Sequence, residues 1–150
     1  MFHRPRFLEK AALIVVTTAS SGLKDVTDYL NGVAHWFGFN VIGSLGVIAT
    51  AFAHAPKYKA GIMQRIEALS TELLDAMKTR KRPDPTIYDL IVFGVFKEKA
   101  AYIERDKEFW QAKGWFDKEY YLDLPIHPFR RFIANLQIKK MKKEKAKSIK

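Results

Sequence analysis

The sequence predicts an α/β protein with two parallel strands flanked by helices and a helical C-terminal extension. Two apolar runs, at residues 11–16 and 41–49, lack the polar alternation of half-exposed strands, which is typical of strands buried on both faces. Between and after these runs, apolar residues recur at helical spacing. Residues 8–80 therefore follow the order strand, helix, strand, helix, which favours a right-handed parallel crossover.

The first helix is expected over residues 22–37. Its apolar side chains fall on one face at Leu23, Val26, Leu30, Val33 and Phe37. Ser20 or Ser21 is expected to cap its N-terminus, where Asp25 suits the positive end of the helix dipole. Gly38 follows the last helical residue, the position at which a left-handed conformation ends many helices.

The second strand is expected over residues 40–49 and the second helix over residues 57–80. Gly43 and Gly46 interrupt this strand and indicate a bulge or a close approach by a neighbouring element. His54 lies in the loop that follows the strand and is a minor candidate for a pocket residue.

Residues 83–138 are expected to form a helical, aromatic-rich extension that packs on a domain at residues 1–82. Asp84 as N-cap and Pro85 at the first helical position predict the start of a helix, whose apolar side includes Tyr102. The aromatic residues that follow are expected in a core or an interface, and packing on a ligand ring is the alternative. They are Trp110, Trp115, Phe116, Tyr120 and Tyr121, with a break at Gly114.

A last helix is expected to begin at Pro128 and to continue into a basic tail at residues 139–150. Phe129, Phe132 and Ile133 are expected to dock this helix on its own domain, and a membrane surface is the alternative. The tail holds seven lysines and one glutamate and so accounts for most of the net charge of +10. We expect a solvated helix end, with weak contact to an acidic surface as the alternative, and no specific nucleic-acid partner.

Several classes of protein are excluded or disfavoured by composition. No cysteine is present, so disulfides and cysteine chemistry within this chain are excluded. The strongest apolar stretch, residues 87–96, contains Asp89 and is about half as long as a membrane-spanning helix. No signal peptide is visible near the N-terminus. We therefore expect a cytoplasmic protein without a transmembrane segment.

Catalytic side chains are not indicated by the polar residues. The four histidines are widely separated in sequence, so no metal site is expected. Glu104, Asp106 and Glu108 alternate with basic residues, which predicts a solvated charged face rather than an acid/base pair. Ser20 and Ser21 have no identifiable base.

The candidate binding site is the segment at residues 17–22, Thr-Thr-Ala-Ser-Ser-Gly, which follows the first strand. In open α/β sheets, ligands bind beyond the carboxyl ends of the strands, where helix N-termini offer unpaired N–H groups. Small side chains there allow a flat ligand to approach the backbone. An ordinary capped turn has the same composition, so both interpretations stay open.

Four segments together resemble the C-terminal half of flavodoxin-like NAD(P)H-dependent flavin reductases. They are "FHRPRF", the apolar strand into "TTASSG", "WFGFNV" and the extension "FWQAKGWFDKEYYLDLPI". The resemblance implies FMN as cofactor, NAD(P)H as co-substrate and a parallel sheet of order 2-1-3-4-5, in which the two strands here are the fourth and fifth. It also implies that a loop lies beside the flavin ring, made of Thr17, Thr18, Ala19, Ser20, Ser21 and Gly22. His3 and Arg4 match a segment near the flavin site or a subunit contact.

The family pattern also includes three earlier strands and a phosphate-binding loop, which these 150 residues do not show. No GxGxxG or GxxxxGK motif occurs. Two strands do not make a stable sheet alone, and the first strand would expose an unpaired edge. We therefore expect a truncated or split flavin oxidoreductase completed by an N-terminal half or by homo-oligomerisation. The alternative is a non-catalytic module that binds a partner through this edge and the aromatic extension.

Overall fold

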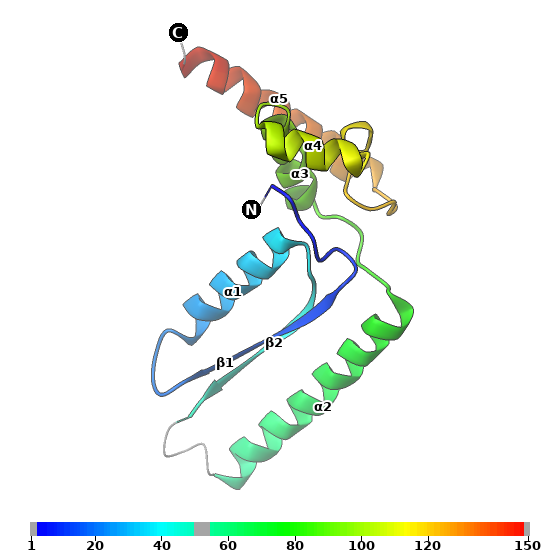
Figure 1. Cartoon of the computed structure of the whole chain (residues 1–150). Helices are drawn as coiled ribbons and strands as arrows, with labels where there is room; N and C mark the ends of the chain where they lie inside the picture. The colour runs from blue at the N-terminus through cyan, green and yellow to red at the C-terminus, as the bar shows by residue number, and fades with distance from the viewer. Residues whose placement is uncertain (1–2, 50–54, 149–150) are drawn as a thin grey trace. The chain divides into compact units, whose positions relative to one another are not determined.

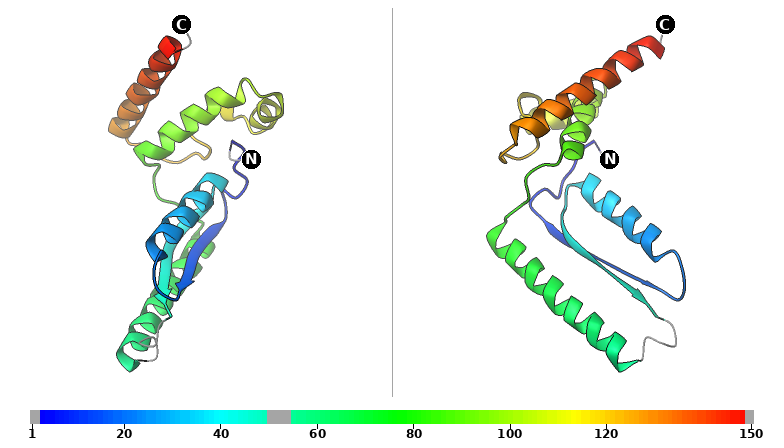
Figure 2. Two further views of the ribbon diagram at one scale, coloured as in Figure 1. Left: turned by 90° about the vertical axis from the view of Figure 1, so that its left-hand side faces the viewer. Right: turned by 180° about the vertical axis from the view of Figure 1, so that it is seen from behind.

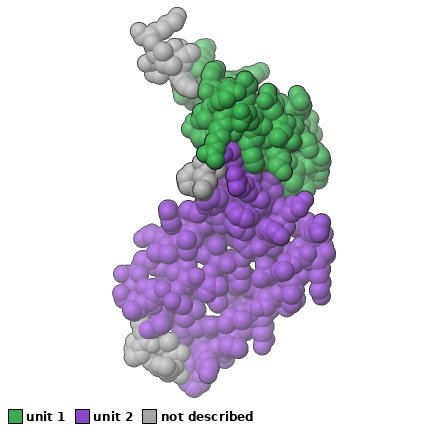
Figure 3. Space-filling view, in the orientation of Figure 1, with its two compact units in different colours: residues 1, 3, 83–150 green, residues 2, 4–82 purple. Residues whose placement is uncertain are grey.

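The computed structural model describes residues 3–49 and 55–148, which divide into two compact units (Figure 3). The first unit, Arg4–Arg82, contains the sheet and is called the α/β unit. The second, His3 with residues 83–148, is called the helical unit. The division between residues 82 and 83 coincides with the change in sequence composition.

The α/β unit is a two-stranded parallel sheet flanked by helices, which confirms the predicted partial α/β fold. Strand β1 (Ala11–Thr18) pairs with β2 (Asn40–Ile48), and helix α1 (Leu23–Phe37) connects them. Helix α2 (Pro56–Thr79) follows β2 along the chain. Figure 1 shows the order strand, helix, strand, helix that the hydrophobic pattern predicts.

The two helices cover opposite faces of the sheet (Figures 1 and 2). A Cβ atom added to Gly46 would lie 2.8 Å from Cδ2 of Leu23 in α1. One added to Gly43 would lie 2.7 Å from Cδ2 of Leu69 in α2. Because alternate strand residues point to opposite faces, positions 43 and 46 meet different helices.

A bulge precedes Gly43 in β2. Ala12 pairs with Val41, but Leu13 pairs with Gly43, so Ile42 is an extra residue in β2. The predicted bulge or close approach at these glycines is therefore confirmed on both counts.

The end of α1 is fixed by Gly38, which adopts a left-handed φ of 94° as predicted. Close to it, the guanidinium of Arg82 joins three segments of the unit. Its Nη1 donates to the carbonyl oxygens of Leu8 (2.5 Å) and Gly38 (3.0 Å), and its Nη2 donates to the carbonyl oxygen of Phe39 (3.1 Å). The last residue of the α/β unit thus ties together the start of the unit and the loop between α1 and β2.

The core of the α/β unit is thin. Among its described residues, the buried apolar side chains are Val16, Ala34, Leu45 and Leu69. Val15, in the middle of β1, is 56% exposed, and on α2 the side chains of Leu74 and Met77 are 54% and 61% exposed. No third strand occurs in the part of the chain that the structure describes, so β1 has one unpaired edge.

The described residues of the helical unit form three helices and one short 3₁₀ helix at Trp115–Asp117. The helices are α3 (Ile87–Ala100), α4 (Glu104–Ala112) and α5 (Pro128–Ser148). Gly114, with φ of 63°, separates α4 from the 3₁₀ helix, and α5 begins at Pro128, both as predicted.

An aromatic cluster fills the core of the helical unit. Trp110 is fully buried, and its ring centroid lies 5.3 Å from that of Phe93 and 5.4 Å from that of Trp115. Tyr121 packs edge-on against Phe93 at 4.7 Å, and Tyr120 is also buried. Core packing, the expected role of these aromatic residues, is confirmed. Burial raises the pKa of the Tyr121 phenol far above its ordinary value, so this side chain stays neutral.

The start of α3 differs from the prediction. Asp84 and Pro85 are not the N-cap and first helical residue; the N-cap is Thr86. Its hydroxyl accepts from the N–H of Asp89 at 3.2 Å, and an Asp89 carboxylate oxygen accepts from the N–H of Thr86 at 2.7 Å. This reciprocal capping box satisfies two helix-end donors, which a lone Asp84 cap would not.

Two further packing predictions for this unit are wrong. Tyr102 does not lie on the apolar side of α3, because the helix ends at Ala100 and the tyrosine is 81% exposed. Helix α5 packs against α3 in its own unit and Ile133 is half-buried, but Phe129 and Phe132 do not dock, since they are 62% and 63% exposed. The inner side of α5 is formed by Ala134, which is 2% exposed, and by Ile138 beside Gly94.

Candidate functional site

The β1–α1 loop folds around the hydroxyl group of Thr18. This hydroxyl donates to the carbonyl oxygen of Ser21 at 2.9 Å and accepts from the N–H of Ser20 at 3.3 Å. The carbonyl oxygen of Thr18 accepts from the N–H of Ala49 at 2.7 Å, which fixes the loop to the end of β2. Thr18 therefore supports the loop and is half-buried.

The N-terminus of α1 has no side-chain cap, from a serine or from any other residue. Gly22 is the N-cap residue, with φ of 78°, and the carbonyl oxygen of Gly22 accepts from the N–H of Val26 at 3.0 Å. The predicted side-chain cap from Ser20 or Ser21 is wrong, because Gly22 supplies the left-handed turn and no side chain bonds to the helix end. A Cβ on Gly22 would meet nothing within 4 Å, so the space beside this turn is open.

The remaining loop residues are exposed. Thr17, Ala19, Ser20, Ser21 and Gly22 all present small groups to solvent at the carboxyl end of β1. Asp25 lies in the first turn of α1, where its carboxylate opposes the positive end of the helix dipole. The negative charge of Asp25 thus makes this helix end less favourable for a phosphate than for a neutral, flat group that hydrogen-bonds to the backbone.

Tyr58 is a residue of this edge that the sequence analysis missed. Its hydroxyl lies 3.1 Å from the nitrogen and 3.2 Å from the oxygen of Ile48, so it holds the last residue of β2. The sequence signal that could have identified Tyr58 is its place in the first turn of the helix that follows a strand. His54, a candidate pocket residue, lies outside the described residues.

Arg4 and the β1–α1 loop lie at different ends of α1. The N–H groups of Arg6 and Phe7 donate to the carbonyl oxygen of Phe37 at 3.1 and 3.2 Å, so the segment after Arg4 packs at the C-terminal end of this helix. The β1–α1 loop adjoins its N-terminal end, roughly 22 Å away for fifteen helical residues. The structure therefore does not bring Arg4 together with residues 17–22.

His3 belongs to the helical unit, where it contacts α4. Nδ1 of His3 lies 3.1 Å from a carboxylate oxygen of Asp106, whose side chain is only 7% exposed. The carbonyl oxygen of His3 accepts from Nε1 of Trp110 at 2.6 Å. The prediction that Asp106 lies on a solvated face is wrong, because this pairing buries it. The pair ties residue 3 to the aromatic core.

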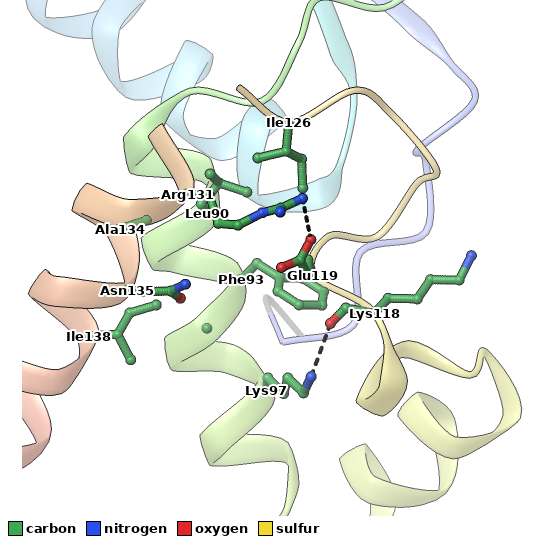
Figure 4. A pocket seen from close by; sticks show the side chains of 11 residues that line it. Leu90, Phe93, Lys97, Lys118, Glu119, Ile126, Arg131, Ala134, Asn135 and Ile138 are labelled. Carbon is green, nitrogen blue, oxygen red and sulfur yellow. Dashed lines mark hydrogen bonds and ion pairs between the residues drawn. The ribbon is translucent and has the colours of Figure 1, made fainter. Parts of the chain in front are cut away.

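A hollow of about 160 Å³ lies in the helical unit between α3, α5 and the segment before α5 (Figure 4). Its floor is apolar and includes Leu90, Phe93 and Ile138. Its cations already have partners, since Arg131 pairs with Glu119 at 2.8 Å and Lys97 donates to the carbonyl oxygen of Lys118 at 3.0 Å. Of these two cations, Arg131 has its charge compensated by a carboxylate, whereas Lys97 is hydrogen-bonded to a neutral carbonyl group.

Metal chemistry finds no support in the described parts of the chain, where no three histidine, aspartate or glutamate side chains gather as a potential metal site.

Comparison with known proteins gives no family: no protein-family model, no curated protein and no solved structure matches this chain.

Proposed function

We propose that this chain is the C-terminal part of a flavodoxin-like NAD(P)H-dependent FMN oxidoreductase, whose β1–α1 loop contacts the flavin ring. One observation carries the proposal: a parallel strand with one unpaired edge ends in an exposed loop of small residues at a helix N-terminus. In open α/β sheets, this is where ligands bind.

The loop fits the ring of FMN better than its phosphate. Open space beside Gly22 and the small side chains of Ala19, Ser20 and Ser21 allow a flat ring to approach the backbone. Asp25 disfavours a second negative charge at the same helix end. When bound, FMN supplies hydride transfer between a nicotinamide and an acceptor. The loop orients the ring, and no side chain here need act as proton donor.

In such an enzyme, the phosphate site and the remaining strands would be supplied by polypeptide outside these 150 residues. A strand added along the unpaired edge of β1 would cover Val15, which is 56% exposed. Neighbouring strands satisfy each other's backbone donors and acceptors, so the addition would also complete the hydrogen bonding of β1.

Interaction without catalysis is the second candidate, favoured by the chemistry of the same edge. Ala11–Thr18 contains no charged residue and no proline, the features that usually protect an edge strand. Such a strand suits β-augmentation by a partner chain.

Titration of FMN separates the two candidates. The chain is mixed with FMN alone, and then together with the polypeptide encoded immediately upstream, while quenching of flavin fluorescence is followed. Binding in either mixture is expected to weaken at least tenfold in Ala19→Tyr, which fills the space above the loop. Ala60→Tyr, at an exposed position of α2, is the matched control.

The three outcomes have different meanings. Binding by the chain alone supports a stand-alone flavoprotein, and binding only with the upstream polypeptide supports a split one. If neither mixture quenches the flavin, the enzyme proposal fails. If the two polypeptides then still form a complex, the interaction module is the better description.

A further inference from the structure

Helix α5 carries an exposed apolar stripe along its outer side. Phe129, Phe132 and Leu136 are 62%, 63% and 54% exposed. Their spacing of three and four residues places them on one face of the helix. The opposite side, with Ala134 and Ile138, packs within the helical unit, so the stripe is available to a partner.

Lysines continue the same face toward the C-terminus. Lys140 and Lys143 follow Leu136 at spacings of four and three, and both are exposed. Among the described residues, neither they nor Lys139 has an ion-pair partner, whereas Lys142 on another side of the helix pairs with Glu98 at 3.4 Å. Residues 139–150 contain seven lysines and one glutamate, so this end of the chain carries a net charge of +6.

We propose that α5 docks the protein onto an anionic lipid surface. The three apolar side chains would enter the headgroup region, and the lysines would lie against the lipid phosphates and carboxylates. Stable peripheral binding to membranes generally takes two signals, such as an apolar insertion and a polybasic patch, and α5 presents both on one face. In the described parts of the chain, no helix is long and apolar enough to cross a membrane, so the contact is peripheral. The inference does not depend on the flavin proposal.

The type of cation favours lipid over the other anionic partners. Residues 139–150 contain lysine but no arginine. Flexible, hydrated ammonium groups suit a diffuse anionic surface, whereas recognition of nucleic acid and phosphopeptide relies more on the planar arginine fork. A second copy of α5 is disfavoured, because two tails of the same high charge repel each other.

Vesicle co-sedimentation tests the proposal with the full chain. We expect binding to phosphatidylcholine vesicles that contain phosphatidylserine, little binding to pure phosphatidylcholine, and a fall in binding as salt rises. Phe132→Ser should weaken binding about tenfold through lost apolar insertion. The double variant Lys140→Gln with Lys143→Gln should weaken it by a similar factor.

Matched controls lie elsewhere in the helical unit. Tyr102→Ser removes an aromatic ring that is 81% exposed, and Lys99→Gln with Lys113→Gln removes two exposed charges. These controls should bind as the unmodified chain does. Intrinsic fluorescence of the buried Trp110 and Trp115 reports that each variant remains folded.

Four results would overturn the proposal. They are absence of binding to the anionic vesicles, equal losses in the control and α5 variants, a dimer that Phe132→Ser dissociates, and Phe132-dependent binding to an acidic peptide or duplex RNA that exceeds the binding to vesicles. The third would assign the stripe to a second copy, and the fourth to a soluble acidic partner.

Discussion

The two units of this protein solve the same packing problem with unequal success. Among described residues, the α/β unit buries four apolar side chains, whereas the shorter helical unit buries eight, three of which are Phe93, Trp110 and Trp115. A pair of strands has too little width to be covered by two helices, so side chains such as Val15 stay exposed. Each large aromatic ring buries much area, so a few of them can fill and close a small core.

This difference shows that how completely a core is enclosed depends more on how the helices and strands are arranged than on the number of apolar residues. The strands of the α/β unit are mostly apolar, yet they leave an edge and part of a face without cover in the described residues. The helical unit is rich in charge and still encloses its aromatic cluster. We therefore expect the first unit to be stabilised by a partner and the second to be stable by itself.

The largest expected effect comes from Trp110→Ala in the helical unit. The side chain is fully buried and donates a hydrogen bond to His3, so its loss should lower the free energy of unfolding by about 3–5 kcal/mol. Urea unfolding followed by near-ultraviolet circular dichroism measures the change. Tyr102→Ala, at an exposed position, should change it by less than about 0.5 kcal/mol. A loss below about 1 kcal/mol for Trp110→Ala would show that this core is not closed.

A smaller effect is expected from Gly43→Ala in the α/β unit. The new Cβ would lie 2.7 Å from Leu69, which is only 1% exposed, and overpacking of this kind costs about 1–3 kcal/mol. Gly61→Ala, in an open and exposed part of α2, should instead stabilise by up to about 1 kcal/mol. Hydrogen exchange of β1 and β2 amides measures both changes. If Gly43→Ala has no effect, Leu69 has room to move, and the core of the α/β unit is packed even less tightly than that of the helical unit.

The smallest effect is a pH dependence in the helical unit. The pKa of Tyr121 is raised in the folded state, so its stabilisation is complete below the unfolded value of about 10 and is lost as pH rises above it. At about pH 10.5 the loss should be roughly 1 kcal/mol. Tyr121→Phe keeps the ring contacts and should remove this part of the alkaline decline, while Tyr102→Phe should not. Identical declines in both variants would contradict burial as the cause.

Local sequence patterns predicted the α/β unit well because its elements are defined by neighbours in the chain. The order of strands and helices, Gly38 as the end of α1 and the close approaches at Gly43 and Gly46 are borne out. The expected burial of both strand faces is not, because Val15 in the middle of β1 is 56% exposed. The position of the candidate site follows from the same logic, since parallel strands end where ligands bind.

The errors arise where partners are distant or where local options compete. Asp106 was assigned to solvent, but its partner His3 lies 103 residues away, beyond any sequence pattern. At the start of α3, Asp84 and Thr86 are both good caps, and only Thr86 can form the reciprocal pair with Asp89. In the β1–α1 loop, the N-cap residue of α1 is Gly22 rather than a serine, because its left-handed φ of 78° favours glycine.

Arg82 has a consequence for the order of events during synthesis. Its three hydrogen bonds to Leu8, Gly38 and Phe39 cannot form until the last residue of the α/β unit has left the ribosome. Chains generally fold domain by domain as they emerge. A nascent chain halted just before Arg82 would therefore keep three backbone acceptors at the amino end of the sheet without this donor.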